Sequence, residues 1–131
     1  MKIGEAATQS GVSAKMIRYY ESIGLLHKAR RQDNSYRDFD ERDIHDLRFI
    51  RRSRSLGFSI AEIEQLLALW RDTERPHKEV KEIVGNHISE LEQRIHDMQE
   101  VVETLKNLSM RCSGHDRPDC PILIGLSGNE K

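Results

Sequence analysis

The sequence predicts a mostly α-helical protein: a winged helix-turn-helix domain, one long helix, and a short loop bounded by two cysteines. Three observations lead to this fold class. Apolar residues recur at helical spacing through most of the 131 residues. An unbroken heptad pattern follows from about residue 76. The only two cysteines, Cys112 and Cys120, come directly after that pattern in CSGHDRPDC. We therefore divide the chain into residues 1–70, 76–111 and 112–131.

The first 26 residues are expected to form two short helices around a tight turn. Gly11 permits the turn, Ser13 is a good N-cap for the second helix, and Gly24 ends it. One apolar face of the second helix is expected to carry Met16, Ile17 and Tyr20. This is the helix-turn-helix pattern, whose second helix can enter a DNA major groove.

The next segment, KARRQDNSYRDF, has no helical periodicity. Its turn formers are flanked by basic and aromatic residues, namely Arg30, Arg31, Tyr36 and Arg37. A short hairpin of this kind would be a wing that brings arginines close to phosphates. The alternative is a solvated surface loop.

A second pair of helices is expected after the wing. Asp40 can cap a helix that runs to about Leu56, and Ser59 with Glu62 forms a capping box for the next one. Arg54, just before the connecting turn, can reach a phosphate or can be an ordinary surface charge. The apolar side of the last helix is expected to contain Ile60, Ile63, Leu66, Leu67 and Trp70.

Charge is divided unevenly along the chain. Residues 1–54 contain 12 Lys/Arg and 8 Asp/Glu, whereas residues 55–131 contain 9 and 14. The two parts therefore carry +4 and −5, in agreement with the overall −1. A basic first part favours an anionic partner such as nucleic acid, although ordinary surface solvation explains +4 equally well.

The long helix carries a continuous apolar seam with steps of four and three residues: Val84, Ile88, Leu91, Ile95, Met98, Val102 and Leu105. About 30 helical residues span ~45 Å, which is more than a small domain needs internally. We expect a coiled-coil homodimer. The seam extends backwards to Lys81 and His77 and forwards to Cys112. If the two helices run antiparallel, His77 and Lys81 of one subunit approach Cys112 of its mate.

Two thiols in one loop indicate a soft-metal site. An iron–sulfur cluster normally requires four cysteines, and zinc prefers four ligands, which here would have to include His115, an aspartate or His77. Cu(I), Ag(I) and Au(I) accept two sulfurs, so the pair favours a monovalent ion. A redox dithiol is the alternative, but the spacing differs from Cys-x-x-Cys.

Several function classes are disfavoured. The sequence has no run of apolar residues long enough to span a membrane and no basic-apolar leader, so we expect a cytoplasmic protein that does not bind membranes. We expect no enzymatic activity, because no Ser/His/Asp set, acid pair or phosphate loop occurs at a usable spacing.

The motifs KIGEAATQSGVSAKMIRYYESIGLL, YRDF and RRSRSLGFS, the long helix and the terminal cysteine loop together resemble the MerR family of metal-responsive transcription regulators. The resemblance covers essentially the whole chain. The loop CSGHDRPDCPIL is most similar to that of the copper-sensing CueR branch. The resemblance implies a winged helix-turn-helix homodimer joined by an antiparallel coiled coil. It also implies that Cu(I) binding distorts promoter DNA, which realigns the promoter for RNA polymerase and activates copper-resistance genes.

The resemblance also assigns roles to residues. It implies DNA contacts by Lys15, Arg18, Tyr20, Arg31, Tyr36, Arg37 and Arg54, and copper ligation by Cys112 and Cys120. His77 departs from the family, because copper sensors usually have Ser there and divalent-metal sensors have Cys. Ser35 replaces the usual wing Gly, which can strain that turn. The alternatives are a divalent-metal regulator that recruits His77 or His115, and a non-regulatory copper-binding or thiol-redox protein.

Overall fold

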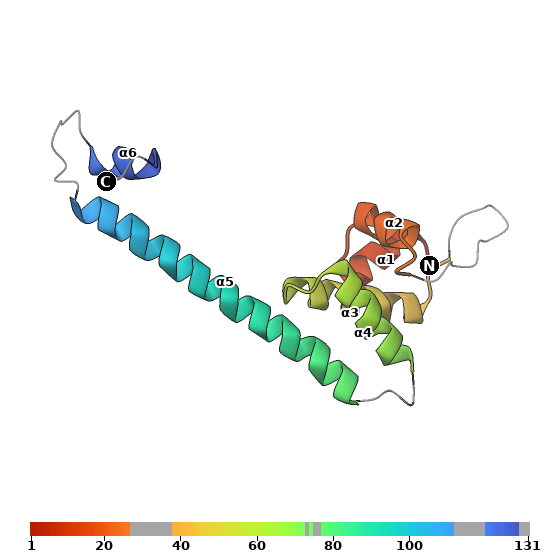
Figure 1. Cartoon of the computed structure of the whole chain (residues 1–131). Coiled ribbons are helices and arrows are strands. Elements are labelled where there is room, and N and C mark those ends of the chain that lie inside the picture. Colours follow the sequence, from red (N-terminus) through yellow and green to blue (C-terminus); the bar gives the residue numbers. More distant parts are fainter. Residues whose placement is uncertain (27–37, 73, 75–76, 112–119, 129–131) are drawn as a thin grey trace. The chain divides into compact units, whose positions relative to one another are not determined.

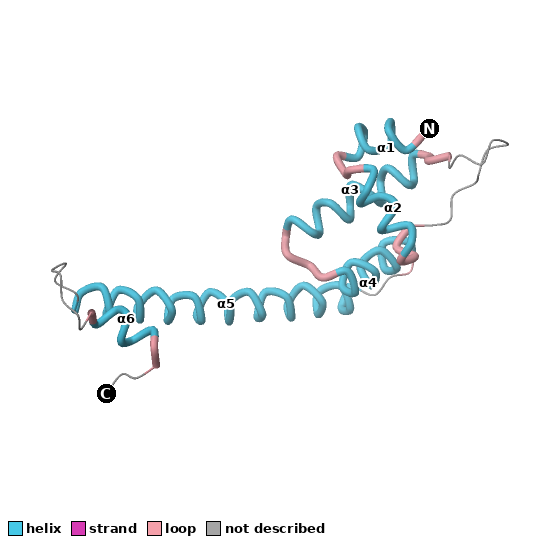
Figure 2. Tube along the Cα trace, turned by 90° about the horizontal axis from the view of Figure 1, so that it is seen from above, coloured by secondary structure: helices cyan, strands magenta, loops and turns pink. Residues whose placement is uncertain are grey.

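The structure is a computed structural model that describes residues 1–26, 38–72, 74, 77–111 and 120–128 (Figure 1). These parts are helices joined by loops and contain no strand (Figure 2). The expected mostly helical fold is therefore confirmed. The expected wing lies in residues 27–37, outside the described residues, as do Cys112 and His115. The chain divides into two units, Met1–Ile83 and Val84–Lys131, which are described separately below.

The helix-turn-helix is formed by α1 (Ile3–Ser10) and α2 (Ala14–Ser22). Gly11, between them, has φ +77°, a left-handed conformation that glycine adopts without strain. The hydroxyl of Ser13 accepts a hydrogen bond from the backbone N–H of Met16 at 3.2 Å and so caps α2. Gly24, with φ +79°, follows the end of α2. The predicted turn at Gly11, the N-cap at Ser13 and the helix end at Gly24 are therefore all present.

Helices α3 (Glu41–Ser55) and α4 (Ile60–Arg71) complete the first unit's helical core. Each begins with a reciprocal capping box. Asp40 and Asp43 form the first, and Ser59 and Glu62 form the second. Because both partners in each box satisfy a backbone N–H that the helix leaves unpaired, the two starting points are fixed by local sequence.

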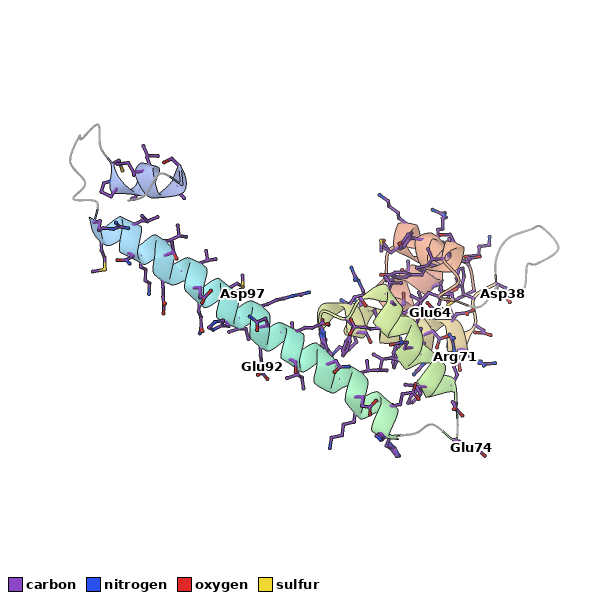
Figure 3. The ribbon with its side chains drawn as sticks, viewed as in Figure 1. Asp38, Glu64, Arg71, Glu74, Glu92 and Asp97 are labelled. Atoms are coloured by element: carbon purple, nitrogen blue, oxygen red, sulfur yellow. The ribbon has the colours of Figure 1, made fainter. Side chains whose placement is uncertain are left out.

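The core of the first unit lies where α1, α2, α3 and α4 meet. It consists of buried residues that include Ala6, Ile17, Leu26, Phe39, Leu47, Ile50, Ile63 and Leu67. Asp46 and Arg71 add a polar tie between α3 and α4, with Oδ2 and Nη2 2.6 Å apart. Figure 3 labels Arg71 at the end of α4.

Trp70 does not belong to this core, contrary to the helical spacing. Its side chain is 48% exposed. The indole instead stacks on the imidazole of His45, with ring centroids 5.1 Å apart and 19° between the planes. The pattern was wrong here because Trp70 lies in the last turn of α4, where its ring meets those of His45 and Phe49 on α3 and stays about half exposed.

The long helix α5 (His77–Arg111) has the predicted extent. In the second unit, its seam residues Val84, Ile88, Ile95, Met98, Val102 and Leu105 are 37–69% exposed. The short helix α6 (Pro121–Leu126) packs on α5 at Leu108, which is buried. None of the described helices is long and apolar enough to cross a membrane.

Candidate nucleic-acid interface and metal-binding segment

The exposed face of α2 carries two of the predicted DNA contacts. Lys15 and Arg18 are three residues apart and both exposed. Tyr20 is different, because its side chain is only 5% exposed and belongs to the core cluster. The two basic side chains are therefore available to an anionic partner, while the ring of Tyr20 helps to hold α2 against the domain.

Sequence reasoning missed a second feature of α2. Met16, Tyr19 and Ile23 are all exposed, at 37%, 48% and 43%. Met16 was expected on one apolar face with Ile17 and Tyr20, but only Ile17 and Tyr20 are buried. The signal was present in the sequence, since Met16, Tyr19 and Ile23 are themselves spaced along one side of a helix.

Two arginines of α3 contact the helix-turn-helix backbone. Arg48 donates from Nε and Nη2 to the carbonyl oxygen of Gln9, at 3.2 and 2.9 Å. The guanidinium of Arg51 lies beside Gly11, where an added Cβ would be 3.0 Å from Nη1. Both arginines therefore hold the end of α1 and the turn that follows it.

Arg54 stands at the end of α3, where a phosphate contact was expected. It is exposed, and its Nη1 lies 3.4 Å from the carbonyl oxygen of Phe58. That long hydrogen bond spans the turn before α4 and leaves the remaining guanidinium N–H groups able to meet another acceptor. The predicted wing contacts, Arg31, Tyr36 and Arg37, lie outside the described residues.

Of the two predicted copper ligands, the described residues include Cys120. It is half-buried and is the N-cap residue of α6, and its carbonyl oxygen accepts from the N–H of Ile124 at 3.0 Å. Pro121 occupies the first helical position, as expected from the sequence. Cys120 thus precedes a defined helix. Cys112 and His115 lie outside the described residues.

His77 and Lys81 occupy the first turns of α5. Both side chains are exposed. They are four residues apart, so they point to the same side of the helix. This spacing is the one that the seam extension required.

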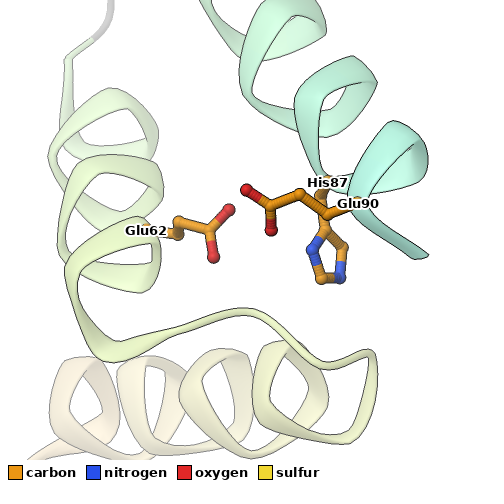
Figure 4. A group of neighbouring side chains, drawn as sticks. All are labelled: Glu62, His87 and Glu90. Carbon is orange, nitrogen blue, oxygen red and sulfur yellow. The ribbon is translucent and has the colours of Figure 1, made fainter. Parts of the chain in front are cut away.

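Figure 4 shows three further residues of types that can bind a metal, Glu62, His87 and Glu90. His87 and Glu90 are three residues apart on α5 in the second unit. Glu62 belongs to the first unit, where its Oε1 accepts from the N–H of Ser59 at 2.9 Å. These three residues therefore define no metal site within either unit.

Two family models match the chain. One, described as MerR HTH family regulatory protein, matches residues 1–69, and another, described as MerR, DNA binding, matches residues 44–108. The chain belongs to the MerR family. This confirms the resemblance inferred from the motifs. The family is one of transcription regulators.

Individual MerR proteins and structures are similar over nearly the full length. Heavy metal-dependent transcription regulator 2 of Rhizobium meliloti is 55% identical, with 94% of this chain and 84% of the relative covered. The regulator CueR of Salmonella typhimurium is 34% identical, with 98% and 93% covered. The crystal structure of PbrR691 from Ralstonia metallidurans in complex with lead(II) is 32% identical, has a TM-score of 0.87, and covers 96% of this chain and 98% of that chain.

The family match to residues 1–69 includes the Gly11 turn, the Ser13 cap and both capping boxes. The match to residues 44–108 includes most of α5. CueR and the lead(II)-bound PbrR691 structure have similar identities to this chain, 34% and 32%, so overall identity does not indicate which metal the chain binds.

Proposed function

We propose that this chain is a Cu(I)-responsive transcriptional activator that binds promoter DNA as a homodimer. In this proposal Ag(I) and Au(I) can replace Cu(I), and the bound ion is held by Cys112 and Cys120. Metal binding distorts the DNA, so that RNA polymerase transcribes copper-resistance genes. The single observation that carries the DNA-binding part is the exposed basic face of α2 on a MerR helix-turn-helix scaffold.

The homodimer is supported by the α5 seam. Six large apolar side chains along about 20 residues are at least 37% exposed in the single chain. Such a stripe is unfavourable in water and is the surface that a coiled coil buries. A second copy of α5 is the simplest partner, because the same seam supplies both halves of the interface.

The choice of Cu(I) is supported by the donor set. The chain has only two cysteines, and position 77 is His rather than the Cys that divalent-metal sensors of the family carry. Two thiolates suit a monovalent soft ion, whereas zinc and lead sites take further ligands. The alternative is a divalent-metal regulator that uses His77 or His115 as an extra ligand. It is favoured by the exposure of His77 at the start of α5 and by the existence of a lead(II)-bound structural relative.

Transcription reconstituted with RNA polymerase tests this proposal. The template is the chain's own promoter region, and Cu(I) is supplied under reducing conditions. Cys112→Ser and Cys120→Ser should each abolish the metal-induced transcript while promoter affinity stays unchanged in an electrophoretic shift. Induction that survives in either variant would refute the two-thiolate site.

His77→Ser is the matched control, because it alters the nearby position without removing a thiol. We expect it to retain the Cu(I) response. Loss of the response in His77→Ser, together with nitrogen coordination in X-ray absorption spectra of the metal-loaded protein, would favour the divalent-metal alternative. Two short sulfur neighbours and no nitrogen would support Cu(I).

A further inference from the structure

Building on the proposed DNA binding, we infer that Met16 and Tyr19 read thymine methyl groups in the major groove. They form an apolar row on the exposed face of α2, next to its basic residues. This inference adds a sequence-reading role to two residues that neither the motif resemblance nor the helical pattern selected.

The row follows from helix geometry and exposure. At about 100° per residue, Tyr19, Ile23 and Met16 fall within roughly 60° of one another around the helix axis. All three are exposed, whereas Ile17 and Tyr20, about 100° and 40° from Met16 around the helix, are buried. A nine-residue helix that already buries its own apolar face thus presents a second one.

The flanking charge identifies the partner as DNA. Lys15 and Arg18 are both exposed and lie about 40° and 100° from Tyr19 around the helix, so cations border the apolar row on one side. A partner protein would need about 800 Å² of buried surface on this side. The major groove of DNA, by contrast, accommodates a single helix. The DNA phosphates then lie beside the cations of α2, and the thymine methyl groups lie within reach of its apolar side chains.

Position along α2 indicates which of the three exposed apolar residues can reach the DNA bases. Ser13 caps the helix, so Met16 is the third helical residue and lies in the first turn. N-terminal residues of a recognition helix contact base edges. Met16 and Tyr19 therefore reach the bases, while Ile23, the C-cap residue, lies beyond the part of the helix that enters the groove.

Thymine-to-deoxyuridine replacement tests the inference, because it removes only the methyl group. A randomised duplex pool first gives the preferred site for the full-length protein. Each thymine in a half-site is then replaced by deoxyuridine, and affinities are measured for wild type and for Met16→Ala and Tyr19→Ala. Met110→Ala is a matched control, because Met110 is 84% exposed but lies outside the first unit.

At one or two half-site thymines, deoxyuridine should weaken wild-type binding about fourfold, as expected for one methyl-sized apolar contact of about 0.8 kcal/mol. Met16→Ala or Tyr19→Ala should lose that discrimination at its own position, with less than twofold difference between the two bases. Met110→Ala should discriminate as wild type does. Lys15→Ala should weaken binding to both duplexes equally, because a phosphate contact does not sense the methyl group.

Two negative results have different meanings. If a preferred site is selected but no deoxyuridine substitution matters, or if both alanine variants still discriminate, the thymine-reading role is wrong while DNA binding stands. If the pool gives no sequence-selective binding at all, the proposed regulatory function fails with it.

Discussion

Gly125 should be required for α6 to stay packed on α5. A Cβ at this position would overlap Cδ2 of Leu108 and lie 3.0 Å from Cδ1 and 3.3 Å from Cγ. Leu108 is buried beneath the helix, at 3% exposure. We therefore expect Gly125→Ala to separate α6 from α5, and to loosen the surroundings of Cys120 immediately before it.

Three energies decide the size of this effect. Burial of a leucine side chain contributes about 1.5–3 kcal/mol. Overpacking by one methyl group costs about 1–3 kcal/mol, and replacing a helical Gly by Ala returns up to ~1 kcal/mol through helix propensity. Leu123 and Leu126 of α6 are largely exposed, so little else offsets the loss. Because the added Cβ would overlap Leu108 directly, we take about 2–3 kcal/mol for overpacking, and subtracting ~1 kcal/mol leaves a net cost of about 1–2 kcal/mol. This cost is comparable to the whole docking energy, so α6 should spend much more time undocked.

The assay is the alkylation rate of Cys120 in a Cys112→Ser background, where it is the only thiol in the chain. Adding Gly125→Ala should raise that rate about 5- to 30-fold. Gly85→Ala is the matched control, because an added Cβ there meets nothing within 4 Å and Gly85 is also helical. It should leave the rate unchanged.

A double-mutant cycle with Leu108→Ala isolates the contact. Leu108→Ala itself loosens α6, but it also makes room for the new methyl group. Gly125→Ala should therefore add little or nothing in that background. Equal alkylation rates for the Gly125 and Gly85 variants, or full additivity with Leu108→Ala, would refute the reasoning.

Three other outcomes are expected. Arg48→Ala should lower the free energy of unfolding by about 1 kcal/mol and weaken DNA binding without changing its salt dependence, because Arg48 binds the Gln9 carbonyl; a reduced salt slope would instead mark a phosphate contact. The pKa of Asp40 is lowered below its usual 3.8, mainly by the hydrogen bond that its carboxylate accepts from the backbone N–H of Asp43. The ionised Asp40 therefore stabilises the folded state fully above pH 3.8, and this stabilisation is lost as the pH falls through the lowered pKa. Asp40→Asn keeps the cap acceptor, and its melting temperature should fall less than that of wild type between about pH 5 and 3; equal falls would contradict this. Ile95→Asp should give monomers in sedimentation velocity, whereas Asn86→Asp, on the opposite side of the heptad from the seam, should not; dimers in both would exclude the seam as the interface.

Local chemistry made much of the fold predictable. Three of the described helices begin with a side-chain N-cap, provided by Ser13, Asp40 and Ser59. Each of these side chains accepts a hydrogen bond from the backbone N–H only three residues later. Gly11 similarly fixes a turn by its own left-handed conformation. Such signals need no knowledge of tertiary contacts, so the sequence alone located these helix starts.

Tertiary contacts were less predictable. Helical spacing identifies apolar stripes but not which stripe is buried when one helix carries two, as α2 does. Tyr20 was assigned to DNA by family motif and lies in the core, whereas Met16, expected on the same apolar face, is exposed. The position of Trp70 depended on a histidine of α3, 25 residues earlier, which no local pattern contains.

The same distinction applies to the basic charge of residues 1–54. The net charge of +4 suggested a surface for an anionic partner. In the structure, however, some of these basic residues already contact the protein backbone, whereas others remain exposed. Arg48 satisfies a backbone carbonyl of α1, and Arg51 packs against the turn at Gly11. Lys15 and Arg18 project from α2 and remain exposed. Each phosphate contact changes the logarithmic salt slope by about 0.9, so the slope should reflect residues such as Lys15 and Arg18 rather than the total charge.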